Sequence, residues 1–222
     1  MVYRRTHQVV KRLEARRSAI LAAAREAAAE GGMMAVQIAP VALRASVAAG
    51  TVYRYFPSKA ELIAELIAEV SRDELAAIRQ AADAAPGPSS ALAAAIITVA
   101  VHTLSQRKLA WSVLAEPVDV DISASRLASR RAIAGEIASR IADAVSAGHL
   151  PVQDATLGAT ALLGALYEAL VGPLANDYVD QDTVRTREVV QAVTLLALRA
   201  VGVMDARARG LVVQQEVLPV TP

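Results

Sequence analysis

A ten-residue stretch, GTVYRYFPSK from Gly50 to Lys59, gathers aromatic and basic side chains that are scarce elsewhere in the chain. Three of the seven aromatic residues fall in it, at positions 53, 55 and 56, and Arg54 lies between the two tyrosines. Hydroxyl, guanidinium and ammonium groups donate hydrogen bonds to phosphate oxygens and to base edges. The stretch therefore has the residue types of a nucleic-acid contact.

The charge of the chain is distributed unevenly. Residues 1–60 contain ten basic and three acidic residues, a net charge of +7, so the remainder carries −6 of the overall +1. A basic first quarter joined to an acidic remainder is typical of a polyanion-binding module attached to a part with another task. Arg4 and Arg5 belong to a basic N-terminal arm, which either enters the minor groove of DNA or is a disordered tail, the interpretation we prefer.

Composition excludes several classes of protein. The 222 residues are 55% hydrophobic and rich in Ala and Leu, which favours helices over strands. Cysteine is absent, so disulfides, thiolate zinc sites and cysteine nucleophiles are excluded. The polar, basic N-terminus has no apolar signal region. One segment, Ala155–Ala175, resembles a membrane span, but Glu168 and Pro173 within it favour a buried interface helix. We expect a cytoplasmic protein without a membrane partner.

The pattern predicts an all-α protein of about nine helices. Spacings of three and four residues between apolar positions give a first helix that Gly31 and Gly32 end. Ser58 is the expected N-cap of a long helix, with Glu61 completing a capping box. Proline and glycine at 86–88 mark a boundary after it. The helices expected after the first are Gln37–Ala45, Ala48–Tyr55, Ser58–Ala85, Ala91–Gln106, Ala110–Ala115, Ser123–Gly148, Gln153–Asn176 and Thr183–Val203, followed by a tail, 205–222, without a pattern.

Two short helices joined by a tight turn at Ser46 and Val47, preceded by a supporting helix, form a helix-turn-helix. Residues Ile20 to Lys59 resemble, without gaps, the DNA-binding domain of the TetR family of bacterial transcription regulators, most specifically in GTVYRYFPSK. The resemblance implies that residues 1–60 form a small DNA-binding domain. Phe56 is expected to fill the centre of that domain. The resemblance also implies a DNA interface, for which the candidates are Gln37, Arg44, Ala48, Ala49, Gly50, Thr51, Tyr53, Arg54, Tyr55 and Lys59.

Three positions depart from the usual TetR pattern. Ser46 stands where the family has glycine in the turn, and Ala48 replaces the serine N-cap of the recognition helix, a loss of about 1 kcal/mol. Ala28 replaces a phenylalanine of the first helix, so the small core must close differently. Because Ala49 and Gly50 lie where base-reading side chains are common, direct readout is expected from Tyr53, from arginines, and from alanine contacts with thymine methyl groups.

Residues 87–204 more weakly resemble the ligand-binding and dimerisation domain of that family. The resemblance implies a homodimer through a four-helix bundle built from residues 153–176 and 183–203 of each subunit, with two recognition helices facing a palindromic operator. A pocket for a small, largely hydrophobic effector is expected because residues 91–115 hold few fixed charges. The candidate pocket residues are His102, Trp111, Glu116, Tyr167 and Glu168.

The expected function is a ligand-responsive transcriptional repressor that needs no cofactor or metal. An enzyme is the main alternative, but the chain lacks GxSxG, HExxH, GxGxxG and GxxxxGK[ST] motifs. His102 with Glu116, Asp119 and Asp121 is conceivable as a metal site, although Pro117 prevents the carboxylates from sharing a helical face. A second alternative is a helical ligand-binding or dimerisation protein whose helix-turn-helix no longer binds DNA.

Overall fold

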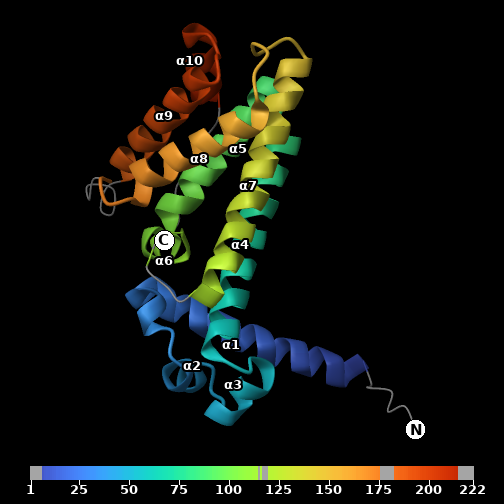
Figure 1. Ribbon diagram of the computed structural model, residues 1–222, viewed down its shortest axis with the longest axis vertical. Helices are drawn as coiled ribbons and strands as arrows, with labels where there is room; N and C mark the ends of the chain where they lie inside the picture. Colours follow the sequence, from blue (N-terminus) through green and yellow to red (C-terminus); the bar gives the residue numbers. More distant parts are fainter. Residues whose placement is uncertain (1–6, 115, 117–119, 176–182, 215–222) are drawn as a thin grey trace.

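The computed structural model describes residues 7–114, 116, 120–175 and 183–214, and within these ranges it contains ten helices and no strand (Figure 1). The expectation of an all-α fold is confirmed. The helices are α1 (His7–Ala35), α2 (Ile38–Arg44), α3 (Ala49–Tyr55), α4 (Lys59–Asp83), α5 (Pro88–Ser105), α6 (Arg107–Leu114), α7 (Val120–Ser146), α8 (Ala155–Val171), α9 (Thr183–Ala200) and α10 (Asp205–Gln214).

The molecule is elongated, with α1, α2 and α3 at one end and α8, α9 and α10 at the other (Figure 1). Helix α4 rises from the first group and packs against α5 and α7, so it runs from one end of the molecule into the other. Helix α5 lies in the middle of the second group, where it also contacts α8 and α9. Any displacement of α4 therefore affects both ends.

Buried apolar side chains form two clusters, which we call the N-terminal core and the C-terminal core. The N-terminal core is built from α1 to α3 and the first half of α4, as far as Ile67. The C-terminal core starts at Ile78 of the same helix and continues through α5, α7, α8, α9 and α10. Three residues from beyond α5 join the N-terminal core: Leu109 and Val113 of α6, and Ile122 of α7. The helix-turn-helix unit thus shares its core with α6. These side chains help to close the core, where Ala28 stands in place of the phenylalanine expected from the family pattern.

Several helix ends agree with the sequence and others do not. The Ser58 side chain accepts a hydrogen bond from the Glu61 amide at 3.1 Å, which confirms the N-cap of α4. Gly148 has a φ of 70° just after α7, the conformation expected of a C-terminal glycine. Helix α6 starts at Arg107 instead of Ala110. The tail was expected to lack a pattern, yet it contains α10, and that expectation was wrong.

One described helix, α5, is long and apolar enough to cross a membrane by length and composition. The sequence analysis instead singled out residues 155–175, which contain the shorter helix α8. In α5, 67% of the apolar window is buried inside the protein. Helix α5 is therefore placed as the central core helix of the second half of the molecule.

An ion-pair network ties α4 to α7 beside this core. Glu136 of α7 accepts hydrogen bonds from Arg79 and from Arg140, each at 2.8 Å, and Arg140 also pairs with Asp83 at 2.8 Å. Burial alone would raise the pKa of the Glu136 carboxyl, but the two arginines hold that pKa below its ordinary value. The carboxylate is therefore charged at neutral pH and fixes the register of α4 against α7.

The turn between α2 and α3 contains a strained residue. Ser46 has a φ of 53°, and it is the one non-glycine residue in the described ranges with a positive φ. This left-handed conformation costs about 1 kcal/mol for a residue with a Cβ atom. The turn is held by the Val47 amide, which donates to the Ala42 carbonyl at 2.9 Å.

We expect Ser46→Gly to raise the free energy of unfolding by about 0.5–1 kcal/mol, because glycine adopts this φ without strain. Urea denaturation followed by circular dichroism measures the change. The matched control is Ser18→Gly, at an exposed position inside α1, where glycine should lower stability by a similar amount. A destabilised Ser46→Gly variant would show that the serine hydroxyl contributes more than the strain costs.

Candidate DNA interface and effector site

Helices α2 and α3 form the helix-turn-helix, and their inner faces decide which side chains point outward. Val41 and Ala42 of α2 and Val52 of α3 are buried where the two helices cross. Small residues at this crossing allow the close approach that the motif requires. As a result, the first turn of α3, from Ala49, and the side chain of Tyr53 lie on the solvent side.

The exposed surface of α3 starts with residues that have almost no side chain. Ala48, Ala49 and Gly50 are all exposed, and Ala48 caps the helix without a side-chain hydrogen bond. Further along, Tyr53 is 51% exposed and Arg54 is also exposed, with its guanidinium 5.6 Å from the centroid of the Tyr55 ring. The small residues at the start of α3 would let another molecule approach the backbone closely. Tyr53 adds an aromatic hydroxyl to this surface, and Arg54 adds a cation.

Two of the candidate DNA contacts are engaged within the protein. Arg44 donates to both carboxylate oxygens of Glu30, at 3.0 and 2.6 Å, and lies 3.5 Å from Glu26. The hydrogen bond from Arg44 lowers the pKa of Glu30, so both partners stay charged at neutral pH. The Gln37 side-chain amide donates to the Met34 carbonyl at 2.9 Å. In this conformation both side chains support the end of α1.

Tyr55 lies deeper than the other candidate DNA contacts of α3. Its side chain packs against the N-terminal core, and its hydroxyl is buried without a hydrogen-bond partner. Val52 and Tyr55 are three residues apart, so on a helix they share one face, and Val52 is buried. The Tyr55 hydroxyl therefore does not reach the surface to contact a phosphate. Thr51 and Lys59 remain half-buried at the edge of the exposed surface.

Phe56, immediately after α3, is buried in the N-terminal core with 3% of its surface exposed. The guanidinium of Arg17 lies 5.3 Å from the centroid of its ring, within the range of a cation–π contact. Arg17 also pairs with Glu65 of α4 at 3.0 Å. One phenylalanine thus holds α1, α3 and α4 together and sets the position of the exposed α3 surface.

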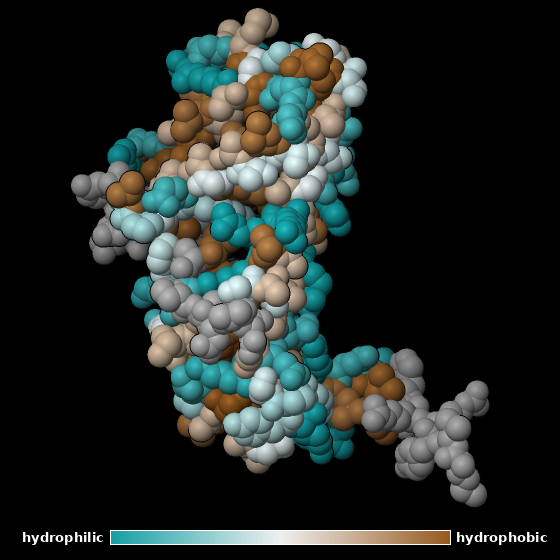
Figure 2. All heavy atoms as spheres, viewed as in Figure 1, coloured by the Kyte–Doolittle hydropathy of each residue, from teal (hydrophilic) through white to brown (hydrophobic). Residues whose placement is uncertain are grey.

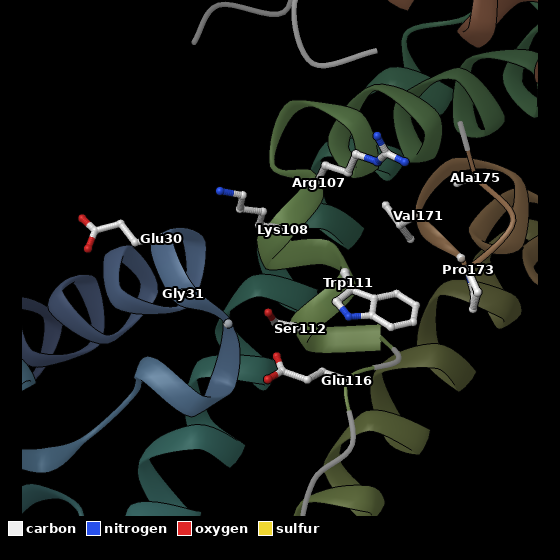
Figure 3. Close-up of a pocket in the computed structure, with 12 residues that line it drawn as sticks. Glu30, Gly31, Arg107, Lys108, Trp111, Ser112, Glu116, Val171, Pro173 and Ala175 are labelled. Atoms are coloured by element: carbon white, nitrogen blue, oxygen red, sulfur yellow. The ribbon is translucent and has the colours of Figure 1, made fainter. Parts of the chain in front are cut away.

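A cleft of about 620 Å³ lies between the end of α1, one side of α6 and the end of α8 (Figure 3). The Trp111 indole is turned toward Val171 and Pro173, while Lys108 extends on the side of Glu30 (Figure 3). The volume falls within the range of small-molecule sites, about 300–1,000 Å³. Of the five candidate effector residues, Trp111 and Glu116 line this cleft.

Glu116 connects the two halves of the molecule at the floor of the cleft (Figure 3). Its carboxylate accepts a hydrogen bond from the Met33 amide at 2.7 Å, across 83 positions of sequence. Gly32, with a φ of 72°, makes this approach possible, because a Cβ atom there would lie 2.7 Å from the Glu116 carboxylate. Arg126 of α7 donates to the carbonyls of Ser112 and Glu116 and so fixes the end of α6.

A second, smaller space lies on the other side of α6, and we call it the inner cavity. Its volume is about 30 Å³, and it is lined by residues of α1, α4, α5 and α6: Arg25, Val70, Glu74, His102, Thr103, Gln106, Leu109, Ala110, Val113 and Leu114. Burial lowers the pKa of His102, and the charge of Arg25 lowers it further, so the imidazole is neutral at neutral pH. Burial raises the pKa of Glu74 to about 7.

Comparison with known proteins gives a family match in the first third of the chain. The family described as "Bacterial regulatory proteins, tetR family" matches residues 20–66, which contain α2, α3 and the start of α4. The HTH-type transcriptional repressor KstR of Rhodococcus jostii is 53% identical over 53 residues, and KstR of Mycobacterium tuberculosis is 56% identical over 48 residues. Residues 20–66 therefore form a DNA-binding domain of the TetR type.

The sequence similarity to these repressors covers only a short part of the chain. It covers 24% of this chain and 25% of the Rhodococcus protein, so about a quarter of each is aligned. The fold similarity extends further. RolR in complex with resorcinol has a TM-score of 0.66 at 22% identity over 93% of this chain and 97% of RolR. FadR of Bacillus subtilis in complex with stearoyl-CoA has a TM-score of 0.67 at 18% identity, over 80% and 97%. The fold of the whole chain is therefore similar to that of these regulators, whereas most of the side chains differ.

The five candidate effector residues do not lie together in the structure. Trp111 and Glu116 line the cleft, whereas His102 lines the inner cavity. Tyr167 is buried in the C-terminal core, and its hydroxyl has no hydrogen-bond partner. Glu168 is exposed on α8 and lines neither the cleft nor the inner cavity. Asp119 of the alternative metal site lies outside the described residues, and the described part of the chain holds no cluster of three metal-ligating side chains.

Two important residues were missed by the sequence analysis. Glu74 was overlooked because the search for pocket charges covered only residues 91–115. It lies four residues after Val70 and four before Ile78, so the helical period places it on the inward stripe of α4. Gly32 was recognised as a helix end but not as the partner of Glu116, since a contact across 83 positions leaves no local signal.

The interdomain hydrogen bond of Glu116 gives a testable prediction. We expect Glu116→Ala to lower the free energy of unfolding by about 1.5 kcal/mol, because the buried Met33 amide loses a charged acceptor. Hydrogen exchange at the Met33 amide should become faster in the variant. Glu116→Gln is the matched control, because its amide oxygen still accepts the bond and should preserve most of the protection. Unchanged exchange at Met33 in Glu116→Ala would contradict the prediction.

Proposed function

We propose that this protein is a cytoplasmic transcriptional repressor that binds a palindromic operator as a homodimer and is released by a small effector. One observation carries the regulatory part of the proposal. Helix α6, which borders both the cleft and the inner cavity, places Leu109 and Val113 in the same buried cluster as the helix-turn-helix. A molecule that moves α6 thus acts directly on the core that positions α3.

In this proposal the two cores correspond to two domains with different functions. Residues 1–60 with the linking helix α4 serve as the DNA-binding domain, and residues 87–204 hold the effector and the dimer contact. On DNA, Tyr53 reads base edges or phosphates, and Thr51 and Lys59 bond phosphates at the edge of the surface. The exposed Ala48 and Ala49 contact thymine methyl groups in the major groove. The charged pair of Arg44 with Glu30 orients α2 and leaves Arg54 as the freer cation of the recognition helix.

The outer face of α8 supports the proposed dimer. Its exposed residues are small or apolar apart from one carboxylate: Thr156, Leu157, Thr160, Ala161, Gly164, Ala165, Glu168 and Ala169. Figure 2 shows this face as a band of white to brown residues across the upper half of the molecule. Leu157 and, on α9, Leu196 are 67% and 60% exposed in the single chain. Packing α8 and α9 against the same pair of a second subunit would cover these side chains.

Dimerisation through α8 and α9 would set the spacing of the two recognition helices. Half-sites about 34–36 Å apart correspond to one turn of DNA, and an effector that changes this separation weakens binding to both half-sites at once. The effector must favour one of the two conformations, and a coupling of about 1–3 kcal/mol is typical of such regulators. Effector binding would change the position of α3 by moving α6 and α4.

Selection of bound duplexes from a random-sequence DNA pool tests the proposal at near-physiological salt. We expect enrichment of an inverted repeat by the wild-type protein, and loss of at least tenfold in affinity for that repeat in Tyr53→Ala. Lys59→Ala should weaken binding to all sequences and reduce the salt dependence. Lys108→Ala is the matched control, because it removes the same charge outside the helix-turn-helix. Salt-sensitive binding without any enriched repeat would favour a helix-turn-helix that no longer reads DNA.

A further inference from the structure

Helix α1 extends well beyond the core that it supports. Its first buried residue is Ile20, and residues 8–16, which we call the α1 extension, are exposed apart from the half-buried Leu13. Figure 1 shows this part of α1 projecting past α4, at the end of the molecule that carries α2 and α3. At 1.5 Å per residue the extension is about 14 Å long. Arg4 and Arg5 precede it and lie outside the described residues. The extension therefore has a free surface next to the helix-turn-helix.

The α1 extension is basic, and the protein itself does not use its cations. It contains Lys11, Arg12 and Arg16 with a single acidic residue. Within the described part of the chain these three cations form no ion pair, whereas Arg17 and Arg25, further along α1, pair with carboxylates of α4 at 3.0 and 2.8 Å. Arg12 and Arg16 are four residues apart, so they lie on one face of the helix. Exposed cations in a row, without carboxylate partners, are complementary to the phosphates of a nucleic-acid strand.

The base of the extension is fixed relative to α3. Arg17 lies 5.3 Å from the centroid of the Phe56 ring and pairs with Glu65 of α4. Phe56 directly follows α3, so the contacts that position the exposed surface of α3 also set the direction in which the extension leaves the domain. The non-helical residues inside α1 are Gly31 and Gly32, so the helix is continuous from the extension into the N-terminal core. The extension therefore moves together with α3.

We propose that the α1 extension binds the DNA backbone outside the half-site that α3 reads, with Arg12 and Arg16 bonded to phosphates. This inference rests on the proposed function and adds a sequence-independent contact to it. Phosphates follow one another about every 3.4 Å along a strand, so a helix of about 14 Å spans about four of them. The extension thus lengthens the footprint of each subunit by about four base pairs. It raises the affinity without changing which bases are read.

Contact with another protein is the alternative use of the extension. Val9 and Val10 are 43% and 37% exposed, and with Leu13 they continue the apolar stripe of α1 that leads to Ile20. Two partly covered valines offer far less apolar area than a stable interface between proteins requires. A second copy of the extension would also bring like charges together. DNA satisfies the unpaired cations, and it is therefore the partner that the charge favours.

Two duplexes of equal length test the proposal. Both carry the inverted repeat enriched in the random-pool selection, and one has uncharged methylphosphonate linkages at the four positions outside each half-site. We expect the wild-type protein to bind the fully charged duplex at least tenfold more tightly. Arg12→Ala/Arg16→Ala should bind the two duplexes equally, and its salt slope on the charged duplex should fall by about two per bound subunit. Arg130→Ala/Arg131→Ala is the matched control, because it removes two exposed arginines from α7.

Equal affinity of the wild-type protein for the two duplexes would overturn the proposal, as would a wild-type preference that persists in Arg12→Ala/Arg16→Ala. Loss of self-association in Val9→Ser/Val10→Ser, with DNA affinity unchanged in Arg12→Ala/Arg16→Ala, would assign the extension to protein contact instead. Circular dichroism checks the folding of each variant, and alanine favours helix at both arginine positions. If no repeat is enriched, the proposed function fails, and the salt slope is then compared on a duplex of random sequence. A reduced slope in Arg12→Ala/Arg16→Ala there would support the backbone contact, and an unchanged slope would overturn it.

Discussion

Replacement of Phe56 by alanine should lower the free energy of unfolding by about 3–5 kcal/mol, the usual cost of removing a buried phenylalanine ring. Phe56 is 3% exposed and is the one phenylalanine of the chain. Its ring contacts the core that joins α1, α3 and α4, and the Arg17 guanidinium lies over it. The alanines at positions 23, 24, 27 and 28, which belong to the same core, have side chains too short to fill the space that the ring leaves. The cavity would therefore remain.

Urea denaturation at a fixed protein concentration measures this change, because the proposed dimerisation would make the apparent stability depend on concentration. Tyr53→Ala, three positions earlier on the exposed side of α3, is the matched control and should alter the free energy of unfolding by less than about 0.5 kcal/mol. The two variants separate the roles of neighbouring aromatic residues: Phe56→Ala loses stability, and Tyr53→Ala loses DNA affinity. A loss below about 1 kcal/mol for Phe56→Ala would show that α6 closes the core without the ring.

The sequence predicted the fold well where the signal was local. The helix-turn-helix, the Ser58 cap and the Gly148 end all depend on residues within one or two helical turns, and the structure has each of them. The same reasoning could have placed Tyr55 correctly, because it lies one helical turn from the buried Val52. Its inclusion among the DNA contacts followed the resemblance to the TetR DNA-binding domain and not the helical period.

Helix α10 was missed because its stability is not local. A ten-residue helix is marginal alone, and the sequence DARARGLVVQ contains an internal glycine. Burial of Ala208, Leu211 and Val212 in the C-terminal core stabilises it, together with ion pairs from Asp205 to Arg199 and Arg209. The spacing of Asp205 and Arg209 was a visible helical signal, but the burial depends on α5 and α9.

The two spaces beside α6 were also beyond sequence reasoning, for a similar reason. The cleft brings together residues 30–32, 107–116 and 171–175, and the inner cavity joins α1 to α4, α5 and α6. Each segment on its own reads as an ordinary amphipathic or apolar helix. Only the packing of α6 between the two cores shows that Trp111 and His102 face different spaces, and that Glu74 lines the inner one.

Glu74→Gln should stabilise the protein by an amount that depends on pH. In the folded protein burial raises the pKa of Glu74 from 4.5 to about 7, so the carboxyl takes up a proton on folding between these values. The wild-type protein therefore loses stability as the pH rises from about 4.5 to 7, and the loss is complete above 7. Since each tenfold change in a protonation equilibrium corresponds to about 1.4 kcal/mol, the full cost is about 3 kcal/mol. Glutamine does not ionise and avoids it.

The measurement is the free energy of unfolding of both proteins from pH 4.5 to 8.5. We expect a difference near zero at pH 4.5 that grows through pH 7 and levels off at about 3 kcal/mol in favour of Glu74→Gln. The lowered pKa of His102 makes both proteins less stable in acid, and this contribution cancels in the difference. A difference that is constant with pH would mean that Glu74 finds a partner when it is ionised.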